Sequence, residues 1–407
     1  MSQDLIQQLT RLSQARNFTP PAEAHIGVLE VTTNAVLGRQ YEYNENIAQS
    51  GLERLLLNTN YCLRVYFLHQ EDSWSPLSIS EDMLQTLMQE HDISLDFMDV
   101  LSCFRRRTGN SDRGYSAPIR QVRTGYRHEI AYGCKFPEKR TSSPDSDDPW
   151  SIRQLGIYHQ LDALSHRSTV IVLCPRPRSP VVDAVKKSLQ DWASRTEDLQ
   201  DPRTLHQILF DHSFRGWLEY MQFYESKISD HFDNLVVVSG NVPPDHVEFE
   251  QIANLRFIED SCMPLTPIYS HLSRVLKCLQ GLEMSQKSSD NYLLIQESQF
   301  QSTIQNYEHQ LAGFMENATL LSTRITSVSQ LLSDTLTFKQ QQIATEQQHI
   351  AIEQQHIATK QQNLATTQNG LVLRLTQLSV NDSNAVRVIT ILTLIYLPAT
   401  TIAYRPF

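Results

Sequence analysis

The chain has 407 residues, which is enough for two or three domains. Hydrophobic residues make up 40% and charged residues 20% of it, a balance that fits a globular protein with one membrane segment and excludes a chain with many membrane spans. The net charge of −10 argues against nucleic acid as a partner, because binding the phosphate backbone requires a basic surface. The six cysteines are scattered without a Cys-x-x-Cys pair, which predicts reduced thiols in the cytosol.

Residues 1–22 are expected to be a leader with one short amphipathic helix that ends near Pro20 and Pro21. This leader lacks the central apolar run that signal peptides have. The soluble part of the chain is therefore expected to stay in the cytosol.

Residues 23–245 mix strand and helix patterns, which predicts an α+β or α/β cytosolic domain. Strands are expected where branched and aromatic residues gather, at 62–68, 128–136, 168–174 and 235–238. Helical patterns cover 94–104 and 204–233. A further helix is expected to begin after Ser80, whose hydroxyl can accept from a free backbone N–H of the first turn.

Trp150, Arg153 and Gln154, followed by Tyr158 and His159, form a dense polar and aromatic cluster that is expected to open a helix. One interpretation is a functional site. The favoured alternative is structural, with the residues before Trp150 starting the helix and the aromatic rings packing in the core. The sequence contains no nucleotide-binding loop, zinc-protease motif or nucleophile elbow, so we assign no catalytic residue and expect no enzyme.

Residues 246–385 are expected to form a long helical stalk, because no proline occurs between 267 and 398. Within it, residues 341–368 repeat a seven-residue unit four times. One position of the unit is always a large aliphatic residue, and we call this set the stalk seam: Ile343, Ile350, Ile357 and Leu364. A spacing of seven keeps the seam on one line of a supercoiled helix, which predicts association between copies. The alternative is a solvated glutamine-rich tract without a fixed partner. A hinge is expected at Asn369 and Gly370.

The final apolar stretch, 386–404, is predicted to be one transmembrane helix. Its uncharged part would rise roughly 25 Å as a helix, against a hydrocarbon layer of ~30 Å. The alternative is a buried C-terminal helix or strand, since Thr and Ile are also common in sheets. The first interpretation makes the chain a single-pass membrane protein with lipid as a partner and the bulk of the chain in the cytosol.

The residues from Val380 to Thr400 resemble the stalk end and first transmembrane helix of the CorA-type magnesium transporters. The matching positions are Thr390, Thr393, Tyr396, Leu397, Pro398 and Thr400. Upstream, the segments 67–80, 129–133 and 148–159, which include Trp150, Arg153 and Gln154, resemble the cytosolic part of filamentous-fungal CorA-like proteins. The resemblance implies an α/β cytosolic domain, a stalk helix and a pentamer, with Mg²⁺ as a transported or regulatory ion and no other cofactor.

The sequence departs from the family pattern after Ala403. The family continues there to a Gly-Met-Asn selectivity signature and a second membrane helix, whereas this chain ends at Phe407. We therefore expect a truncated member that does not conduct alone. If copies surround an axis, one row of hydroxyls is expected to face the pore: Ser383, Thr390, Thr393 and Thr400. The alternative is that these hydroxyls bond to carbonyls one turn earlier in the same helix.

Two functions follow from the sequence. The first is membership of a divalent-cation transport family, implied by the resemblance. The second is a membrane-anchored regulatory or interaction protein that transports nothing and joins itself or full-length relatives through the stalk. The metal ligands, the ion and the number of copies are not assigned at this stage.

Overall fold

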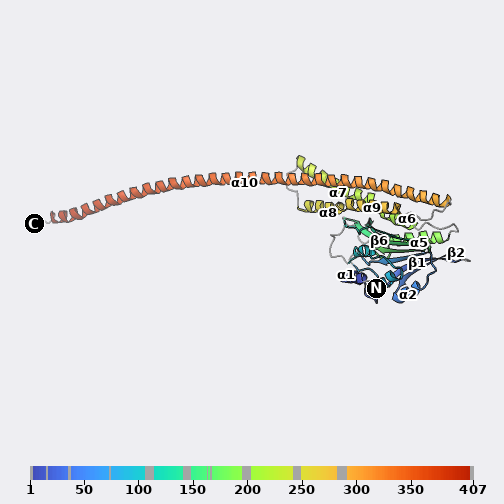
Figure 1. The fold of residues 1–407 in the computed structure, drawn as a ribbon. Helices are drawn as coiled ribbons and strands as arrows, with labels where there is room; N and C mark the ends of the chain where they lie inside the picture. Colours follow the sequence, from blue (N-terminus) through green and yellow to red (C-terminus); the bar gives the residue numbers. More distant parts are fainter. Residues whose placement is uncertain are drawn as a thin grey trace. The chain divides into compact units, whose positions relative to one another are not determined.

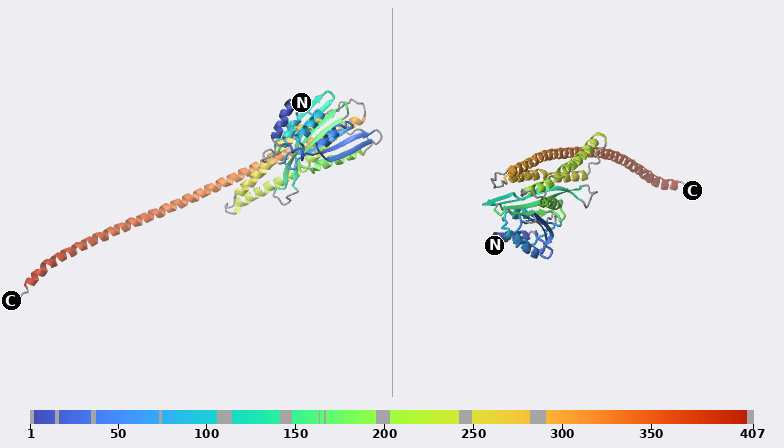
Figure 2. Two further views of the ribbon diagram at one scale, coloured as in Figure 1. Left: turned by 90° about the horizontal axis from the view of Figure 1, so that it is seen from below. Right: turned by 90° about the vertical axis from the view of Figure 1, so that its right-hand side faces the viewer.

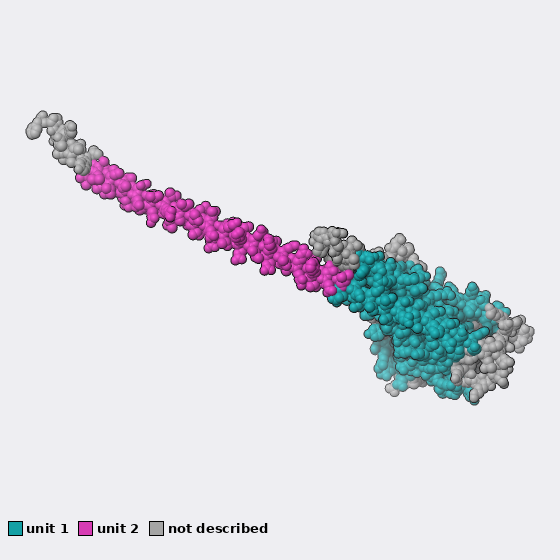
Figure 3. All heavy atoms as spheres, turned by 90° about the horizontal axis from the view of Figure 1, so that it is seen from above, with its two compact units in different colours: residues 1–330 teal, residues 331–407 magenta. Residues whose placement is uncertain are grey.

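The computed structural model describes residues 3–14, 17–34, 38–72, 75–105, 114–140, 148–162, 164–165, 167–194, 203–241, 249–281 and 291–403. Contacts between residues divide the chain into two units, residues 1–330 and 331–407 (Figure 3). The first unit contains a sheet with helices on both faces, and the second unit contains the later part of one long helix.

A seven-stranded sheet forms the centre of the first unit (Figure 1). In their order across the sheet, its strands are β2 Gly38–Ile47, β1 Ile26–Asn34, β3 Leu63–His69, β7 Arg167–Cys174, β6 Trp150–Asp162, β5 Arg127–Lys139 and β4 Arg120–Thr124. Strands β3 and β7 pair in parallel, and the other neighbours pair antiparallel. Both β3 and β7 are buried along nearly their whole length, as expected for central strands covered on both faces.

The N-terminal helices cover one face of this sheet (Figure 2). They are α1 Gln3–Gln14, α2 Gln49–Leu56, α3 Glu81–Glu90 and α4 Phe97–Ser102. Their apolar side chains pack in one core with Val28, Tyr66 and Ile171 of the sheet. The Oγ atom of Ser80 accepts from the backbone N–H of Met83 at 3.2 Å, so the cap predicted for α3 is present.

The later helices cover the opposite face. They are α5 Pro180–Ala193, α6 Thr204–Phe214, α7 Trp217–Asn241, α8 Phe249–Cys262, α9 Leu265–Gln280 and the first part, up to residue 330, of α10 Asn291–Ala403. Helix α5 contacts β2, helices α6, α7 and α9 contact β5, and α8 packs on α7. The early part of α10 packs on α6, where the ring of Tyr307 lies 5.9 Å from Phe210 and 5.1 Å from Phe214. Aromatic packing thus holds the start of α10 against α6 within the first unit.

Most of the strong sequence patterns are confirmed. The strands expected at 62–68, 128–136 and 168–174 are β3, β5 and β7. The short helix expected at 94–104 is the smaller α4. The helical pattern of 204–233 is confirmed but divides into α6 and α7 at Gly216, whose φ of +83° is a backbone conformation that glycine adopts without steric cost.

Two expected elements are wrong. Residues 235–238 belong to helix α7 and not to a strand, because a short run of branched residues continued the helix already formed. The helix expected to open at Trp150 is strand β6, which pairs with β5 on one side and β7 on the other. Tertiary pairing therefore overrode the helix-start signal of the preceding residues.

The long helix expected within residues 246–385 is confirmed as α10, which begins at Asn291. The hinge expected at Asn369 and Gly370 is wrong, since α10 continues through both residues. A glycine inside a helix costs about 1 kcal/mol relative to alanine, which is too little to break a helix of this length. The domain boundaries at 22, 245 and 385 stay predictions.

The predicted membrane span over 386–404 is not found. Across the described residues, no helix is long and apolar enough to cross a lipid bilayer. After Arg387, the described side chains of this stretch cover the uncharged run 388–395, a rise of about 12 Å, and Asn381, Asp382 and Asn384 occupy the turns before Arg387. The side chains of 396–403, and all of 404–407, lie outside the described part of the chain.

Candidate functional sites

A polar hollow of about 900 Å³ lies between the β1–β2 face and helix α2. Its charged lining residues are Glu30, Glu42 and Arg54, its amides are Gln40, Asn44, Asn58 and Asn60, and its apolar wall includes Val28, Ile47 and Leu55. Strand alternation explains most of the set, because even-numbered residues of β1 and β2 point to one face of the sheet. Ile47 joins them because the β1–β2 register shifts between Ile26, its partner, and Val28. Glu30 and Glu42 are direct partners in the β1–β2 register, so their carboxylates start from neighbouring positions.

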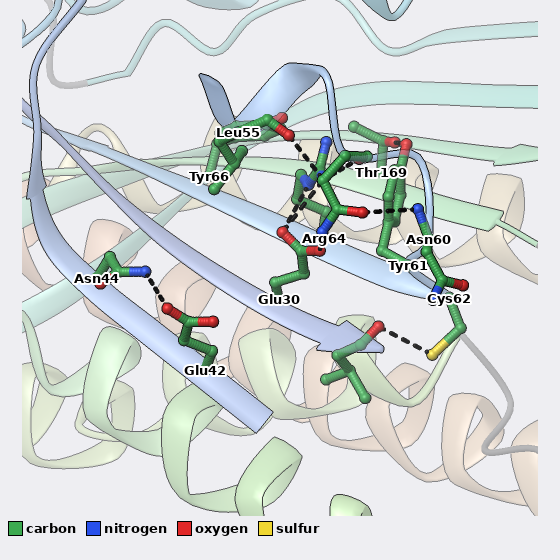
Figure 4. Close-up of polar contacts among 12 residues, drawn as sticks. Glu30, Glu42, Asn44, Leu55, Asn60, Tyr61, Cys62, Arg64, Tyr66 and Thr169 are labelled. Carbon is green, nitrogen blue, oxygen red and sulfur yellow. Dashed lines mark hydrogen bonds and ion pairs between the residues drawn. The ribbon is translucent and has the colours of Figure 1, made fainter. Parts of the chain in front are cut away.

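The floor of the hollow contains a buried ion pair between Glu30 and Arg64. The Arg64 side chain is 1% exposed and that of Glu30 9%, and Nη2 of Arg64 lies 3.1 Å from Oε2 of Glu30 (Figure 4). The amide of Asn58 donates to Oε1 of Glu30 at 3.0 Å. Burial raises the pKa of Glu30 above its ordinary value, and the charge of Arg64 opposes that shift.

Arg64 also fixes the end of helix α2. Its Nη2 donates to the backbone carbonyls of Leu55 at 3.2 Å and Asn58 at 2.7 Å, where a helix C-terminus attracts positive charge. The guanidinium lies 4.0 Å from the ring centre of Tyr61, within the range of a cation–π contact. One arginine therefore joins strand β1, the end of α2 and the loop before β3.

A second polar cluster lies fully inside the first unit. Tyr132 and His206 share a hydrogen bond of 2.7 Å, His206 and His159 one of 2.9 Å, and His159 and Ser168 one of 2.7 Å. Burial lowers the pKa of His159 to about 4, lowers that of His206 further below its ordinary value, and raises that of Tyr132. These groups are neutral at pH 7, and their burial leaves no path for a substrate, so we interpret the cluster as structural.

Trp150, Arg153 and Gln154, which carry part of the family resemblance, lie in β6 and do not line the hollow. Trp150 is 4% exposed and packs edge-on against Tyr220 at 5.7 Å between ring centres. Nε of Arg153 lies 3.3 Å from Oε2 of Glu138, and the amide of Gln154 donates to the Cys103 carbonyl at 2.6 Å. These contacts correspond to the structural interpretation of the cluster. The side chains of the other residues that carry the resemblance, Tyr396, Leu397 and Pro398, lie outside the described part of the chain.

The stalk seam is exposed along α10. Ile343 is 45% exposed, Ile350 53%, Ile357 54% and Leu364 63%. Because α10 continues through Gly370, the same spacing of seven reaches Leu371 and Leu378, at 55% and 61%. These large aliphatic side chains form one line that the described residues of this chain do not cover. Sequence reasoning found this line because its only requirement is a period.

The predicted pore-facing hydroxyls make local bonds. Thr390 Oγ1 donates to the Val386 carbonyl at 2.6 Å, and Thr393 Oγ1 to the Ile389 carbonyl at 2.5 Å. This is the alternative given for them in the sequence, although a hydroxyl with such a bond keeps a lone pair for water or a cation. The pore-facing role of Ser383, Thr390 and Thr393 stays a prediction, and the side chain of Thr400 lies outside the description.

No metal centre is assigned. Among the described side chains, no group of three or more His, Cys, Asp or Glu residues is arranged to hold a metal ion. Sequence reasoning missed the Glu30 and Arg64 pair. Its signal was a single charged residue inside each of two otherwise apolar strands, 26–31 and 63–68. An isolated charge in a buried strand requires a partner, but the sequence does not say which one.

Comparison with known proteins identifies the family. The sequence profile of the CorA-like transporters matches residues 2–124 and 117–236. No curated protein matches the sequence.

Several solved structures resemble the chain at low sequence identity. The CorA magnesium transporter from Methanocaldococcus jannaschii is 11% identical, with a TM-score of 0.47 over 78% of this chain and 80% of that one. The full-length CmaX protein is 15% identical, with a TM-score of 0.42 over 79% of each chain. The cytoplasmic domain of ZntB from Vibrio parahaemolyticus is 8% identical, with a TM-score of 0.36 over 79% of this chain and 99% of that one.

Proposed function

This chain belongs to the family of CorA-like transporters, and from that membership we propose that it takes part in the transport of divalent metal ions, Mg²⁺ first among them. The single observation that carries the proposal is the family match over residues 2–236. In this proposal, the sheet with helices on both faces is the cytosolic domain. The proposal also includes a fungal origin of the chain.

The proposal includes an assembly of several copies of the chain. Its support is the exposed stalk seam, because an isolated helix gains nothing from aliphatic side chains in water. Parallel copies in register would bury Ile350 against Ile350 and Ile357 against Ile357, as heptad repeats do in coiled coils. A pentamer is the number that the family resemblance implies.

Uptake of Mg²⁺ tests the proposal. The chain is expressed in a host that lacks its own magnesium transport, alone and together with a full-length CorA-like relative, and growth and ion uptake are measured at low Mg²⁺. We expect uptake to depend on the chain in at least one of the two strains. Uptake that stays at the empty-host level alone, and at the relative's own level together, would contradict a role in transport.

A second candidate function is a regulatory or interaction protein that transports nothing. The observation that favours it is the same seam, since a line of aliphatic residues spaced by seven can pair with the stalk of a relative as well as with its own copy. Altered uptake by the relative without uptake by the chain alone would support this candidate. Association with membrane lipid stays a prediction, and fractionation of the expressing cells measures it.

A further inference from the structure

We propose that the polar hollow between β1, β2 and α2 binds an organic cation, an ammonium group on a short aliphatic chain. This inference is independent of the proposed transport function, because it concerns a different ligand and residues of the first unit alone. It rests on the charge balance of the floor of the hollow, on its apolar wall and on its size.

The sheet side of the hollow has one negative charge in excess, that of Glu42, and Arg54 on the α2 side carries the opposite charge. Glu30 and Glu42 are register partners on the same face, and the charge of Glu42 contributes to raising the pKa of Glu30. Arg64 pairs with Glu30, and its Nη2 also donates to the carbonyls of Leu55 and Asn58. Within the described residues, Glu42 forms no ion pair; its carboxylate accepts one hydrogen bond, from Asn44 at 2.9 Å (Figure 4).

An ammonium group fits this charge better than a metal ion does. Both carboxylate oxygens of Glu30 already accept hydrogen bonds, Oε1 from Asn58 and Oε2 from Arg64. Since the charge of Glu30 is also paired with Arg64, a divalent ion would find one unpaired carboxylate among the described lining residues, that of Glu42, whereas Mg²⁺ and Ca²⁺ sites in proteins combine several oxygen ligands. A single ammonium requires one carboxylate and neutral acceptors, and Gln40, whose side chain has an amide, lines the same hollow.

The wall of the hollow explains why the cation should be organic. Val28, Ile47 and Leu55 line the hollow beside the charged floor, and Gly51 of α2 lies close to Ile47, where an added Cβ would come within 3.1 Å of Cγ2. The volume of about 900 Å³ lies in the range of small-molecule sites. An aliphatic chain can cover the apolar wall while its ammonium end reaches Glu42, which an inorganic ion cannot do.

Arg54 allows a test of the sign of the ligand's charge. Among the described residues that line the hollow it is the one cation, and its Nε donates to the Ser50 carbonyl at 3.1 Å on α2. Its charge opposes a cationic ligand. Removal of Arg54 should therefore strengthen binding, whereas removal of the Glu42 charge should weaken it.

Calorimetric titration of the full-length chain with 1,4-diaminobutane tests the proposal, with 1,4-butanediol as the uncharged analogue and MgCl₂ as the inorganic cation. We expect the diamine to bind and the diol not to bind. Glu42→Gln should weaken diamine binding by about tenfold or more, since a charged hydrogen bond is lost. Arg54→Gln should strengthen it severalfold.

Glu45→Gln is the matched control, because Glu45 lies on the same strand but does not line the hollow. Circular dichroism of each variant checks the fold, and Glu42 is exposed, so its substitution should leave the fold intact. The proposal is overturned if the diamine fails to bind at millimolar concentration, if the diol binds equally well, or if Glu42→Gln and Glu45→Gln have the same effect. Magnesium that binds more tightly than the diamine and loses its binding in Glu42→Gln would also overturn it, in favour of a metal site.

Discussion

The two units of this chain use aliphatic residues in opposite ways. In the first unit, side chains such as Leu29, Val65 and Ile171 are fully buried in the sheet. In the second unit, Ile350, Ile357 and their neighbours on α10 are about half exposed. The first unit contains its own hydrophobic core, whereas the described side chains of the second unit leave a line of aliphatic residues exposed, which we propose another chain covers. Aliphatic residues therefore predict the buried core of the fold in the first unit, whereas in the second unit they predict a partner.

Polar groups differ between the units in the same way. The first unit buries Glu30, Arg64, His159 and His206 and pairs each of them with groups distant in sequence. On α10, the threonines bond to carbonyls of their own helix, as Thr359 does to Gln355 at 2.8 Å. Long-range pairing therefore specifies the first unit, and local bonding suffices for the second.

The largest effect is expected from Arg64→Ala. It leaves the Glu30 carboxylate buried without its cation and removes the bonds to the end of α2, which should destabilise the first unit by about 3–5 kcal/mol. Chemical denaturation followed by tryptophan fluorescence measures the loss. The double variant Glu30→Gln/Arg64→Met, which removes both charges, should recover a large part of it. A loss below 1 kcal/mol would contradict the importance assigned to this pair.

The buried histidines predict a dependence of stability on pH. The folded-state pKa of His159 is about 4 and its unfolded value is ~6.5, so folding favours the neutral form. This stability is present above pH 6.5 and is lost as the pH falls towards 4. His159 alone should contribute about 2 kcal/mol of destabilisation between pH 7 and pH 5. Denaturation at each pH should show a reduced slope for His159→Gln, while His356→Gln on exposed α10 should keep the wild-type slope.

A smaller effect is expected from the cap of α3. Ser80→Ala removes the acceptor for the Met83 N–H and should cost about 1 kcal/mol in the free energy of unfolding. Ser80→Thr, which keeps a hydroxyl, serves as the control. Equal stability of Ser80→Ala and wild type would mean that solvent or another group replaces the cap.

The smallest effect is expected from a glycine-to-alanine substitution, which should act in opposite directions in the two units. Gly370→Ala on α10 places a Cβ in open space and should stabilise the helix by about 0.5–1 kcal/mol, seen as increased helicity on heating. The same change at Gly156 places a Cβ 2.8 Å from atoms of Leu173, Phe104 and Val100, and should destabilise the first unit. Effects of the same sign at both positions would contradict the contrast between a packed and an unpacked region.

The sequence predicted those features that depend on local pattern. The buried strands β3, β5 and β7, the cap at Ser80 and the long helix α10 follow from composition and period, and the structure confirms them. The helix predicted to begin at Trp150 and the strand predicted at 235–238 were wrong. Residue 150 begins a strand because β6 pairs with its neighbours, and 235–238 are helical because α7 continues through them. The first hairpin, β1 and β2, was not identified, and with it the hollow was missed.

The candidate sites also differ in whether local pattern alone could predict them. The seam could be read from the spacing of Ile343, Ile350 and Ile357 because all its members lie on one helix. The pair of Glu30 and Arg64 joins residues 34 positions apart, and the contact of His159 with His206 joins residues 47 apart. A single sequence contains the residues of such pairs but not the register that brings them together.

Sedimentation equilibrium of the full-length chain tests the central claim most directly, namely that the exposed seam of α10 joins copies of this chain. The account predicts an oligomer for the wild type and a shift towards monomer for Ile350→Gln/Ile357→Gln. It also predicts no shift for Ile352→Gln, since Ile352 is similarly exposed, at 59%, but lies off the seam. A wild-type chain that stays monomeric at high concentration, or an equal shift for Ile352→Gln, would contradict the claim.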